Sequence, residues 1–194
     1  MPDTLQSACV TSCKTGDRFA LVHLTGANYA LERDTQHPLA LSHFPKHSPV
    51  RQIVQLERDD NEECEEFLVA GGHAAVRVTC ADSDDSVPTY TTLSTFQRGC
   101  TCVTASEKVV AAGGDDFKIV VKEHSPTLGT EKAEFELPCP VSSLAIEPLD
   151  EDYLVATATD GKIRVFSVDE KQEIKGLSFR KPGIVVKFFP NKNK

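Results

Sequence analysis

The sequence lacks any long apolar run, and this absence excludes one large class of proteins. None of its 194 residues belongs to a stretch that approaches the roughly 18 consecutive apolar residues needed by a membrane-spanning helix. Residues 1–5 contain neither a positive charge nor a long apolar segment, so we expect no secretory signal. The sequence therefore predicts no membrane partner.

An excess of basic residues is also missing. The formal net charge is −8, from 21 Lys and Arg against 29 Asp and Glu. A domain that binds duplex DNA directly should carry a basic stripe that displaces counterions. Basic residues are scattered here, apart from a small cluster near the carboxyl end at Arg180, Lys181, Lys187, Lys192 and Lys194. We therefore expect this acidic segment to bind proteins and not to bind nucleic acid directly.

The seven cysteines form no CxxC pair, and no histidine pair has zinc-finger spacing. Their odd number and the missing secretory signal favour reduced thiols in the cytosol or nucleus. Cys100 and Cys102 share one face of an alternating strand, where small thiols pack well, so we expect them to be buried. The sequence predicts no metal-binding residue.

Common enzyme motifs are absent as well, including GxSxG, the phosphate loop and HExxH. Gly71-Gly72 and Gly113-Gly114 each close a strand without a following helix, which indicates tight turns and not a phosphate cradle. The acidic runs 59–63 and 82–85 lack the alternating ligands of a calcium loop and are interpreted as solvated loops. We therefore predict no catalytic residue, no cofactor and no enzyme activity.

A pattern of short alternating strands is what the sequence does contain. Its clearest copy has strands at 141–148, 153–158 and 163–166, with a tight Asp160-Gly161 turn and a fourth strand at 172–179. Weaker copies place Leu21, Val69 and Val110 in the position of Val155, at intervals of 48, 41 and 45 residues. A repeat of this length is typical of a β-propeller, because one small sheet cannot bury its faces alone.

The predicted architecture is an all-β, partial propeller that occupies residues 1–194 as one domain. We place four-stranded blades at about 4–44, 50–96, 99–137 and 141–179, with the first strand of a fifth at 184–190. The third strands of the four blades are expected near 28–32, 75–79, 118–122 and 163–167. Eight apolar residues at matched positions are expected between neighbouring sheets: Val69, Val76, Val110, Ile119, Leu144, Val155, Ile163 and Val165.

The segment 141–168 resembles a WD40 repeat, through Val-x-x-Leu-x-Ile-x-Pro, Leu-Val-Ala-Thr-Ala-Thr-Asp-Gly and Ile-Arg-Val-Phe. In that family the turn aspartate bonds to a histidine before the first strand, to a second-strand hydroxyl and onward to a third-strand tryptophan. Asp160 and Asp115 match the turn aspartate, and Thr157 is a candidate hydroxyl partner. Phe166 replaces the tryptophan and Pro138-Cys139-Pro140 replaces Gly-His. The chain contains no tryptophan, so the resemblance implies apolar packing without the full network.

The order of the blades resembles one group of WD40 proteins. The stretch 110–121, Val-Ala-Ala-Gly-Gly-Asp-Asp-Phe-Lys-Ile-Val-Val, precedes the best repeat. It is similar to the third blade in the amino-terminal propeller of the chromosome transmission fidelity protein 4 / acidic nucleoplasmic DNA-binding protein family. The resemblance covers about 18–179. It implies a nuclear, non-catalytic adaptor of DNA replication and sister-chromatid cohesion, with replisome or chromatin proteins as partners of its propeller loops.

Two alternatives remain open. The chain could be a WD40 scaffold of another pathway, such as vesicle coating, ubiquitin ligation or RNA processing, with a cytoplasmic location. A propeller enzyme is the less favoured alternative, because it needs His, Asp or Glu side chains that converge around a central channel.

Four blades and the start of a fifth leave the predicted ring incomplete, since propellers close with four to eight blades and WD40 rings usually have about seven. We therefore expect the natural product to carry further blades. We expect the isolated 194-residue chain to be marginally stable and to self-associate through the unpaired edge of the strand at 184–189.

Overall fold

The structure of the chain is a computed structural model. It describes the backbone of residues 5–12, 18–24, 27–32, 39–40, 50–56, 64–81, 89–125, 129–179 and 185–188. Side chains are described over 50–56, 66–79, 89–125, 129–179 and 185–188. Within these ranges every regular element is a β-strand, and there is no helix that could span a membrane.

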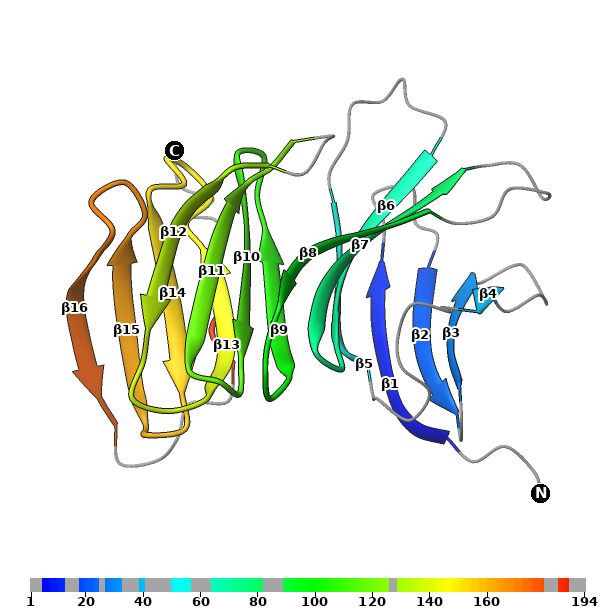
Figure 1. Cartoon of the computed structure of the whole chain (residues 1–194), viewed down its shortest axis with the longest axis horizontal. Helices are drawn as coiled ribbons and strands as arrows, with labels where there is room; N and C mark the ends of the chain where they lie inside the picture. Colours follow the sequence, from blue (N-terminus) through cyan, green and yellow to red (C-terminus); the bar gives the residue numbers. More distant parts are fainter. Residues whose placement is uncertain are drawn as a thin grey trace. The chain divides into compact units, whose positions relative to one another are not determined.

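The strands form four-stranded antiparallel sheets in which consecutive strands are neighbours (Figure 1). The chain divides into two compact units, Met1–Thr95 and Phe96–Lys194. The first unit contains a first sheet of β1 (Leu5–Ser12), β2 (Arg18–Leu24), β3 (Ala27–Glu32) and β4 (Leu39–Ala40), and a second sheet of β5 (Val50–Gln55), β6 (Cys64–Gly71), β7 (Ala74–Ala81) and β8 (Thr89–Thr95). The second unit contains a third sheet of β9 (Cys100–Ala105), β10 (Val109–Gly114), β11 (Lys118–Glu123) and β12 (Glu131–Glu136), and a fourth sheet of β13 (Val141–Ile146), β14 (Tyr153–Ala158), β15 (Lys162–Ser167) and β16 (Gln172–Ser178).

The all-β prediction is confirmed, and the strands lie where the repeat places them. The four predicted third strands coincide with β3, β7, β11 and β15. The predicted strand at 184–190 is wrong over its described residues, because 185–188 form no strand. A strand requires a ladder partner, and no described strand pairs with this segment. Instead the Val186 N–H donates a hydrogen bond to Ser143 Oγ at 3.2 Å.

The third and fourth sheets share one apolar core. Leu154, Ile119 and Val121 are fully buried in it, and the rings of Phe135 and Phe166 lie 4.5 Å apart. Between the first strands of the two sheets, the Thr101 hydroxyl of β9 donates a hydrogen bond to the backbone oxygen of Val141 at the start of β13, at 2.8 Å. Because one small sheet buries little surface alone, this shared core is what stabilises both sheets.

The strand register corrects the predicted alignment of the repeats. Gly113 pairs with Ile119 and Thr157 pairs with Ile163, so equivalent residues lie 44 positions apart and not 45. The turn residues agree, because Phe117 and Gly161 both have positive φ, 73° and 76°. Asp116, and not Asp115, is therefore the equivalent of Asp160.

Equivalent faces of the two sheets point in the same direction. In the third sheet, Ala111, Ile119 and Val121 lie in the core shared with the fourth sheet. Their equivalents in the fourth sheet, 44 residues later, are Val155, Ile163 and Val165. Those residues alternate with Leu154, Ala156 and Phe166, which are the fourth sheet's own contribution to the shared core. We call the face of Val155, Ile163 and Val165, and its equivalent in the third sheet, the forward face.

The same stacking of strands occurs within each unit. In the second unit, β9 and β10 of the third sheet contact β13 of the fourth. In the first unit, β1 and β2 of the first sheet contact β5 of the second. In both units, therefore, the first two strands of one sheet pack against the first strand of the next.

Six of the eight predicted core residues are buried, whereas Ile163 and Val165 are only half-buried. No described strand covers the forward face of the fourth sheet, so these two side chains lack the cover that Ile119 and Val121 have. Gly113 and Gly114 close a strand as predicted, but they do not form the predicted tight turn, because both lie within β10. A Cβ at Gly113 would lie 2.7 Å from Val141 Cγ1, so close packing between sheets requires the glycine. Gly72, with φ 53°, does occupy a turn.

Candidate interaction surface

The connections of the second unit fall at two opposite ends of its sheets (Figure 1). Because neighbouring strands alternate in direction, the β9–β10, β11–β12, β13–β14 and β15–β16 connections lie at one end, which we call the loop end. The β10–β11 and β14–β15 hairpins lie at the other, which we call the turn end. Loops carried by a rigid sheet frame are where binding residues are usually found.

A buried carboxylate ties two loops of the loop end together. Glu151, between β13 and β14, accepts hydrogen bonds at Oε2 from the Ser106 hydroxyl at 2.5 Å and the Lys108 N–H at 2.8 Å. Lys108 Nζ donates in return to the Asp150 backbone oxygen at 3.3 Å. Glu151 has φ 62°, a left-handed conformation that costs free energy. The bonds of its carboxylate to Ser106 and Lys108, and of its N–H to Glu147, hold it in this conformation. These bonds join the third sheet to the fourth at the surface. They were not predicted, because residues so far apart in the sequence give no local signal of their contact.

The side chain of Glu147 fixes the conformation of the β13–β14 loop. Its two carboxylate oxygens accept the N–H groups of Leu149 at 2.9 Å, Asp150 at 2.8 Å and Glu151 at 3.3 Å. These bonds, that of Asp150 first, hold the pKa of Glu147 below its ordinary value because they favour the ionised carboxylate. The loop so formed leaves Leu149 79% exposed. A rigid loop that displays an apolar side chain is suited to protein contact.

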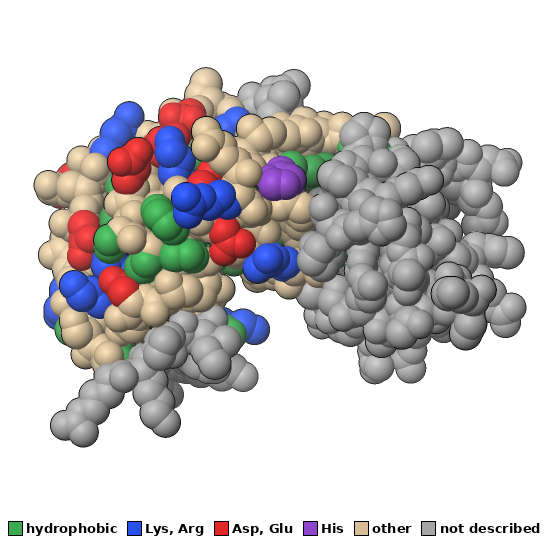
Figure 2. Space-filling model, turned by 60° about the horizontal axis from the view of Figure 1, so that its bottom comes forward, with side chains coloured by type: hydrophobic (Ala, Val, Ile, Leu, Met, Phe, Trp, Pro, Cys, Tyr) green, Lys and Arg blue, Asp and Glu red, His purple; other side chains and the backbone are tan. Residues whose placement is uncertain are grey.

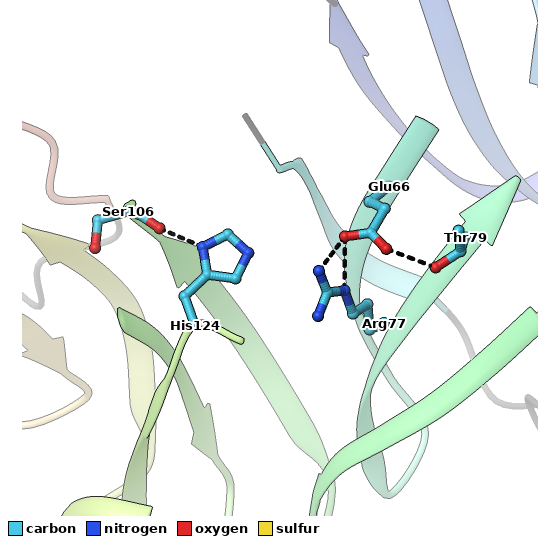
Figure 3. Close-up of polar contacts among 5 residues, drawn as sticks. All are labelled: Glu66, Arg77, Thr79, Ser106 and His124. Atoms are coloured by element: carbon cyan, nitrogen blue, oxygen red, sulfur yellow. Dashed lines mark hydrogen bonds and ion pairs between the residues drawn. The ribbon is translucent and has the colours of Figure 1, made fainter. Parts of the chain in front are cut away.

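The Ser106 hydroxyl and the His124 ring lie near each other but are not arranged for nucleophilic catalysis (Figure 3). His124 Nδ1 lies 2.6 Å from the Ser106 backbone oxygen, while the Ser106 hydroxyl points away from the ring (Figure 3). That hydroxyl bonds to Glu151 and to the Val109 backbone oxygen. A nucleophile needs its base within hydrogen-bond reach of the hydroxyl, which this pair does not provide. The contact therefore orders the loop end.

The loop end carries mostly negative charge. Its exposed acidic residues are Glu107, Glu123, Glu131, Asp150, Asp152, Asp169 and Glu170, and its exposed basic residues are Lys108 and Lys171. Opposite charges on partner surfaces steer association and suppress wrong partners. The charge of this end therefore favours a partner with basic side chains.

The turn end is organised by an ion pair that the predicted WD40 network does not include. Arg164, buried, donates from Nη1 to Asp160 Oδ1 at 3.2 Å and from Nη2 to Asp160 Oδ2 at 2.5 Å. The guanidinium lowers the pKa of Asp160 to about 2. Thr157, the predicted partner of Asp160, instead bonds to Ser142 at 3.0 Å. Arg164, on the third strand of its sheet, is thus the side-chain partner of Asp160 in place of the predicted Thr157 hydroxyl.

The equivalent turn of the third sheet has no arginine at this position, because Val120 stands there. Asp116 Oδ2 accepts the Gln97 N–H at 3.0 Å, and the Arg98 guanidinium lies 5.1 Å from the centre of the Phe117 ring. The turn end comes forward in Figure 2, where acidic and basic side chains intermingle with hydrophobic ones over the described surface. This mixture is unlike the basic stripe of a nucleic-acid interface.

The second sheet contains a buried polar cluster of its own (Figure 3). Arg77 on β7 donates to Glu66 Oε2 on β6 from Nε at 2.7 Å and from Nη2, and the Thr79 hydroxyl donates to Glu66 Oε1 at 2.8 Å. Glu66 and Arg77 are both buried, so a substrate has no access to them. The pair joins β6 to β7 across the sheet, and removal of either partner would leave the other buried without its counter-charge.

The predicted burial of two thiols is confirmed. Cys100 and Cys102 are fully buried, and burial raises the pKa of Cys102 to about 12, which keeps it protonated and unreactive at neutral pH. Cys139 is free and half-buried. Among the residues with described side chains, no group of three or more His, Cys, Asp and Glu residues could hold a metal ion. The side chains of Cys9, Cys13, Cys64 and Cys80 lie outside the described residues.

No protein-family model matches the chain, and no curated protein matches it either. Over its described residues the chain is all-β, its four-stranded antiparallel sheets stack in pairs within each unit, and the second unit displays an acidic loop end held by hydrogen bonds.

Proposed function

We propose that this chain is a non-catalytic protein-interaction scaffold built as a WD40-type β-propeller of about four blades. Two observations support the propeller. Each unit stacks the first two strands of one sheet against the first strand of the next, and the third and fourth sheets direct equivalent faces the same way. Both are expected of blades related by rotation about a common axis.

The loop end is the proposed binding surface, and its rigidity is the observation that carries the proposal. Glu151 and Glu147 hold two loops in fixed positions through hydrogen bonds to Ser106, Lys108 and the loop backbone. A surface ordered before binding loses little conformational entropy when a partner docks. The exposed carboxylates attract a basic segment of the partner, and Leu149 supplies an apolar anchor.

The proposed partners are replisome or chromatin proteins, and the proposed location is the nucleus. This part of the proposal rests on the resemblance of residues 110–121 to the replication-fork adaptor family. The scaffold would then act in DNA replication and sister-chromatid cohesion without contacting DNA itself. A WD40 scaffold of vesicle coats, ubiquitin ligases or RNA processing, located in the cytoplasm, is the alternative.

Proximity labelling in dividing cells tests this function. The chain is fused to a labelling enzyme, and we expect replisome proteins among the labelled proteins during S phase. A double charge reversal at the loop end, Asp150→Lys with Asp152→Lys, should abolish this labelling. The matched control, Glu134→Lys with Glu136→Lys, makes the same charge change on the exposed side of β12 and should retain it.

Two results would count against the proposal. Equal labelling by both double variants would show that the loop end does not select partners. Labelling of coat, ubiquitin-ligase or RNA-processing proteins in place of replisome proteins would favour the alternative pathway.

A further inference from the structure

The turn between β14 and β15 contains the only Asp-Gly pair of the sequence, Asp160-Gly161. In such a pair the backbone nitrogen of the glycine can attack the side-chain carbonyl carbon of the aspartic acid. Attack is easiest at glycine because no Cβ shields the nitrogen, and it is favoured in turns, where the chain brings the two groups together. Gly161 has φ 76°, and the Asp160 side chain is 24% exposed, so water reaches it.

This reaction needs water alone as its co-reactant. A C–N bond forms between Asp160 Cγ and the Gly161 nitrogen, and the amide hydrogen and the carboxyl hydroxyl leave together as water. The product is a five-membered succinimide. Water then adds to one of its two carbonyl carbons. Cleavage at the side-chain carbonyl restores aspartate, whereas cleavage at the backbone carbonyl gives isoaspartate, in which the main chain runs through the former side chain.

In the folded chain, donors hold both carboxylate oxygens of Asp160. Arg164 donates from Nη1 to Oδ1 at 3.2 Å and from Nη2 to Oδ2 at 2.5 Å, and the Lys162 N–H donates to Oδ1 at 3.1 Å. On the other side of the guanidinium, Glu173 Oε2 lies 3.6 Å from Arg164 Nε. These bonds favour the ionised carboxylate, and the hydrogen bond of Arg164 is the first cause that lowers the pKa of Asp160 from 3.8 to about 2. An ionised carboxylate resists attack because it has no hydroxyl to lose as water.

The backbone of the turn provides less restraint than the side chains. The Gly161 N–H donates to the Ala158 backbone oxygen at 3.2 Å, which is the long end of the usual range for such a bond. The attacking nitrogen is therefore held loosely, whereas the carboxylate that it would attack is held by a buried arginine.

We propose that Asp160-Gly161 is a latent site of isoaspartate formation, and that Arg164 keeps it unmodified by holding the Asp160 carboxylate in its ion pair. Release of this carboxylate would expose the turn to a change that the fold cannot absorb. Isoaspartate adds one carbon to the main chain beside Gly161, whose backbone oxygen accepts the Phe179 N–H at 2.9 Å at the end of β16. This role of Arg164 is separate from the proposed function of the loop end.

Incubation of wild type and Arg164→Met for several weeks at pH 7 and physiological temperature tests the proposal. Methionine has a similar length and no charge, so it can fill the buried position. Electron-transfer mass spectrometry of the peptide that contains Asp160 measures isoaspartate, because the two isomers fragment differently. The protonated fraction of a carboxyl group changes tenfold for each unit of pKa, so we expect Arg164→Met to accumulate about tenfold more isoaspartate than wild type, or more.

The matched control is Leu154→Ala, which removes apolar contacts from the same hairpin and leaves both members of the ion pair in place. It should form isoaspartate at the wild-type rate. The Asp-Ser pairs at 82–83 and 85–86 serve as internal controls for handling and should react equally in all three proteins. Circular dichroism checks that each variant is folded at the start, and Arg164→Gln takes the place of Arg164→Met if the latter fails to fold.

Two results would overturn the proposal. Equal isoaspartate at Asp160 in wild type and the folded Arg164 variant would show that the turn backbone alone prevents the reaction. As much isoaspartate in Leu154→Ala as in the Arg164 variant would show that the protection comes from overall stability and not from the ion pair.

Discussion

At the scale of the residue, the two hairpin turns of the second unit use different chemistry at equivalent positions. Asp160 is paired with Arg164, whereas Asp116 accepts a backbone N–H and has no arginine opposite. The sequence identified Asp160 as the turn aspartate, because Asp-Gly is a strong turn signal. It did not identify Arg164 as the partner, because a side-chain ion pair depends on which face of β15 the arginine occupies and how deeply it is buried. The prediction of Thr157 came from the family pattern and was wrong.

Removal of the Asp160 charge should destabilise the fold in a pH-dependent way. Asp160→Asn leaves the buried Arg164 without its closest carboxylate, and we expect the free energy of unfolding to fall by roughly 1–2 kcal/mol at pH 7. The pKa of Asp160 is lowered from 3.8 to about 2, so its stabilising effect is complete above pH 3.8 and is lost as the pH falls through about 2. Urea unfolding of both proteins at several pH values measures this. A difference in stability that stays constant down to pH 2 would show that the charge is not its origin.

The glycines of the second unit give a second test at this scale. A Cβ at Gly114 would meet the Phe96 ring, Asp116 Oδ1 and the Gly99 backbone oxygen, so Gly114→Ala should cost about 1–3 kcal/mol through overpacking. At Gly176 the nearest atom is the flexible end of Glu173, so Gly176→Ala should be neutral or slightly stabilising. Chemical denaturation of both variants compares them. Equal stabilities would contradict the close packing around Gly114.

At the scale of the element, the strands were predictable and their partners across sheets were not. Alternation of apolar residues placed β7, β11, β14 and β15 correctly, because one-sided burial imposes a period of two. The bond between Ser106 and Glu151 joins loops 45 residues apart and has no local signal. The one-residue error in the repeat alignment has the same origin. Aligning Val110 with Val155 matched residue types, whereas the pairings of Gly113 and Thr157 show the true register.

The shared core makes a prediction for one strand, β14. Leu154 is fully buried between the third and fourth sheets, and Leu154→Ala should lower the free energy of unfolding by about 2–5 kcal/mol. The matched control is Leu149→Ala, the same change at a leucine of the exposed loop, which should alter stability little. Thermal and urea unfolding measure both. Similar losses in the two variants would contradict the assignment of Leu154 to the core.

At the scale of the whole chain, composition and repeat length were enough to predict an all-β chain of four-stranded sheets. They could not predict which sheet covers which face, because that depends on stacking and not on periodicity. Ile163 and Val165 show this, since their sequence matches the buried Ile119 and Val121 but no described strand covers them. The strand expected at 184–190 does not form over its described residues 185–188 for a related reason, because a β-strand exists only where a partner accepts its hydrogen bonds.

Hydrogen exchange, read by mass spectrometry, tests whether the third and fourth sheets are stabilised by a shared core. Leu154 lies in the fourth sheet, but its neighbours in the core include Ile119 and Val121 of the third. In Leu154→Ala we therefore expect faster exchange in both sheets, over β9–β12 as well as β13–β16, because they open together. Faster exchange confined to β13–β16, with β9–β12 as protected as in wild type, would contradict the shared core and the stacking inferred from it.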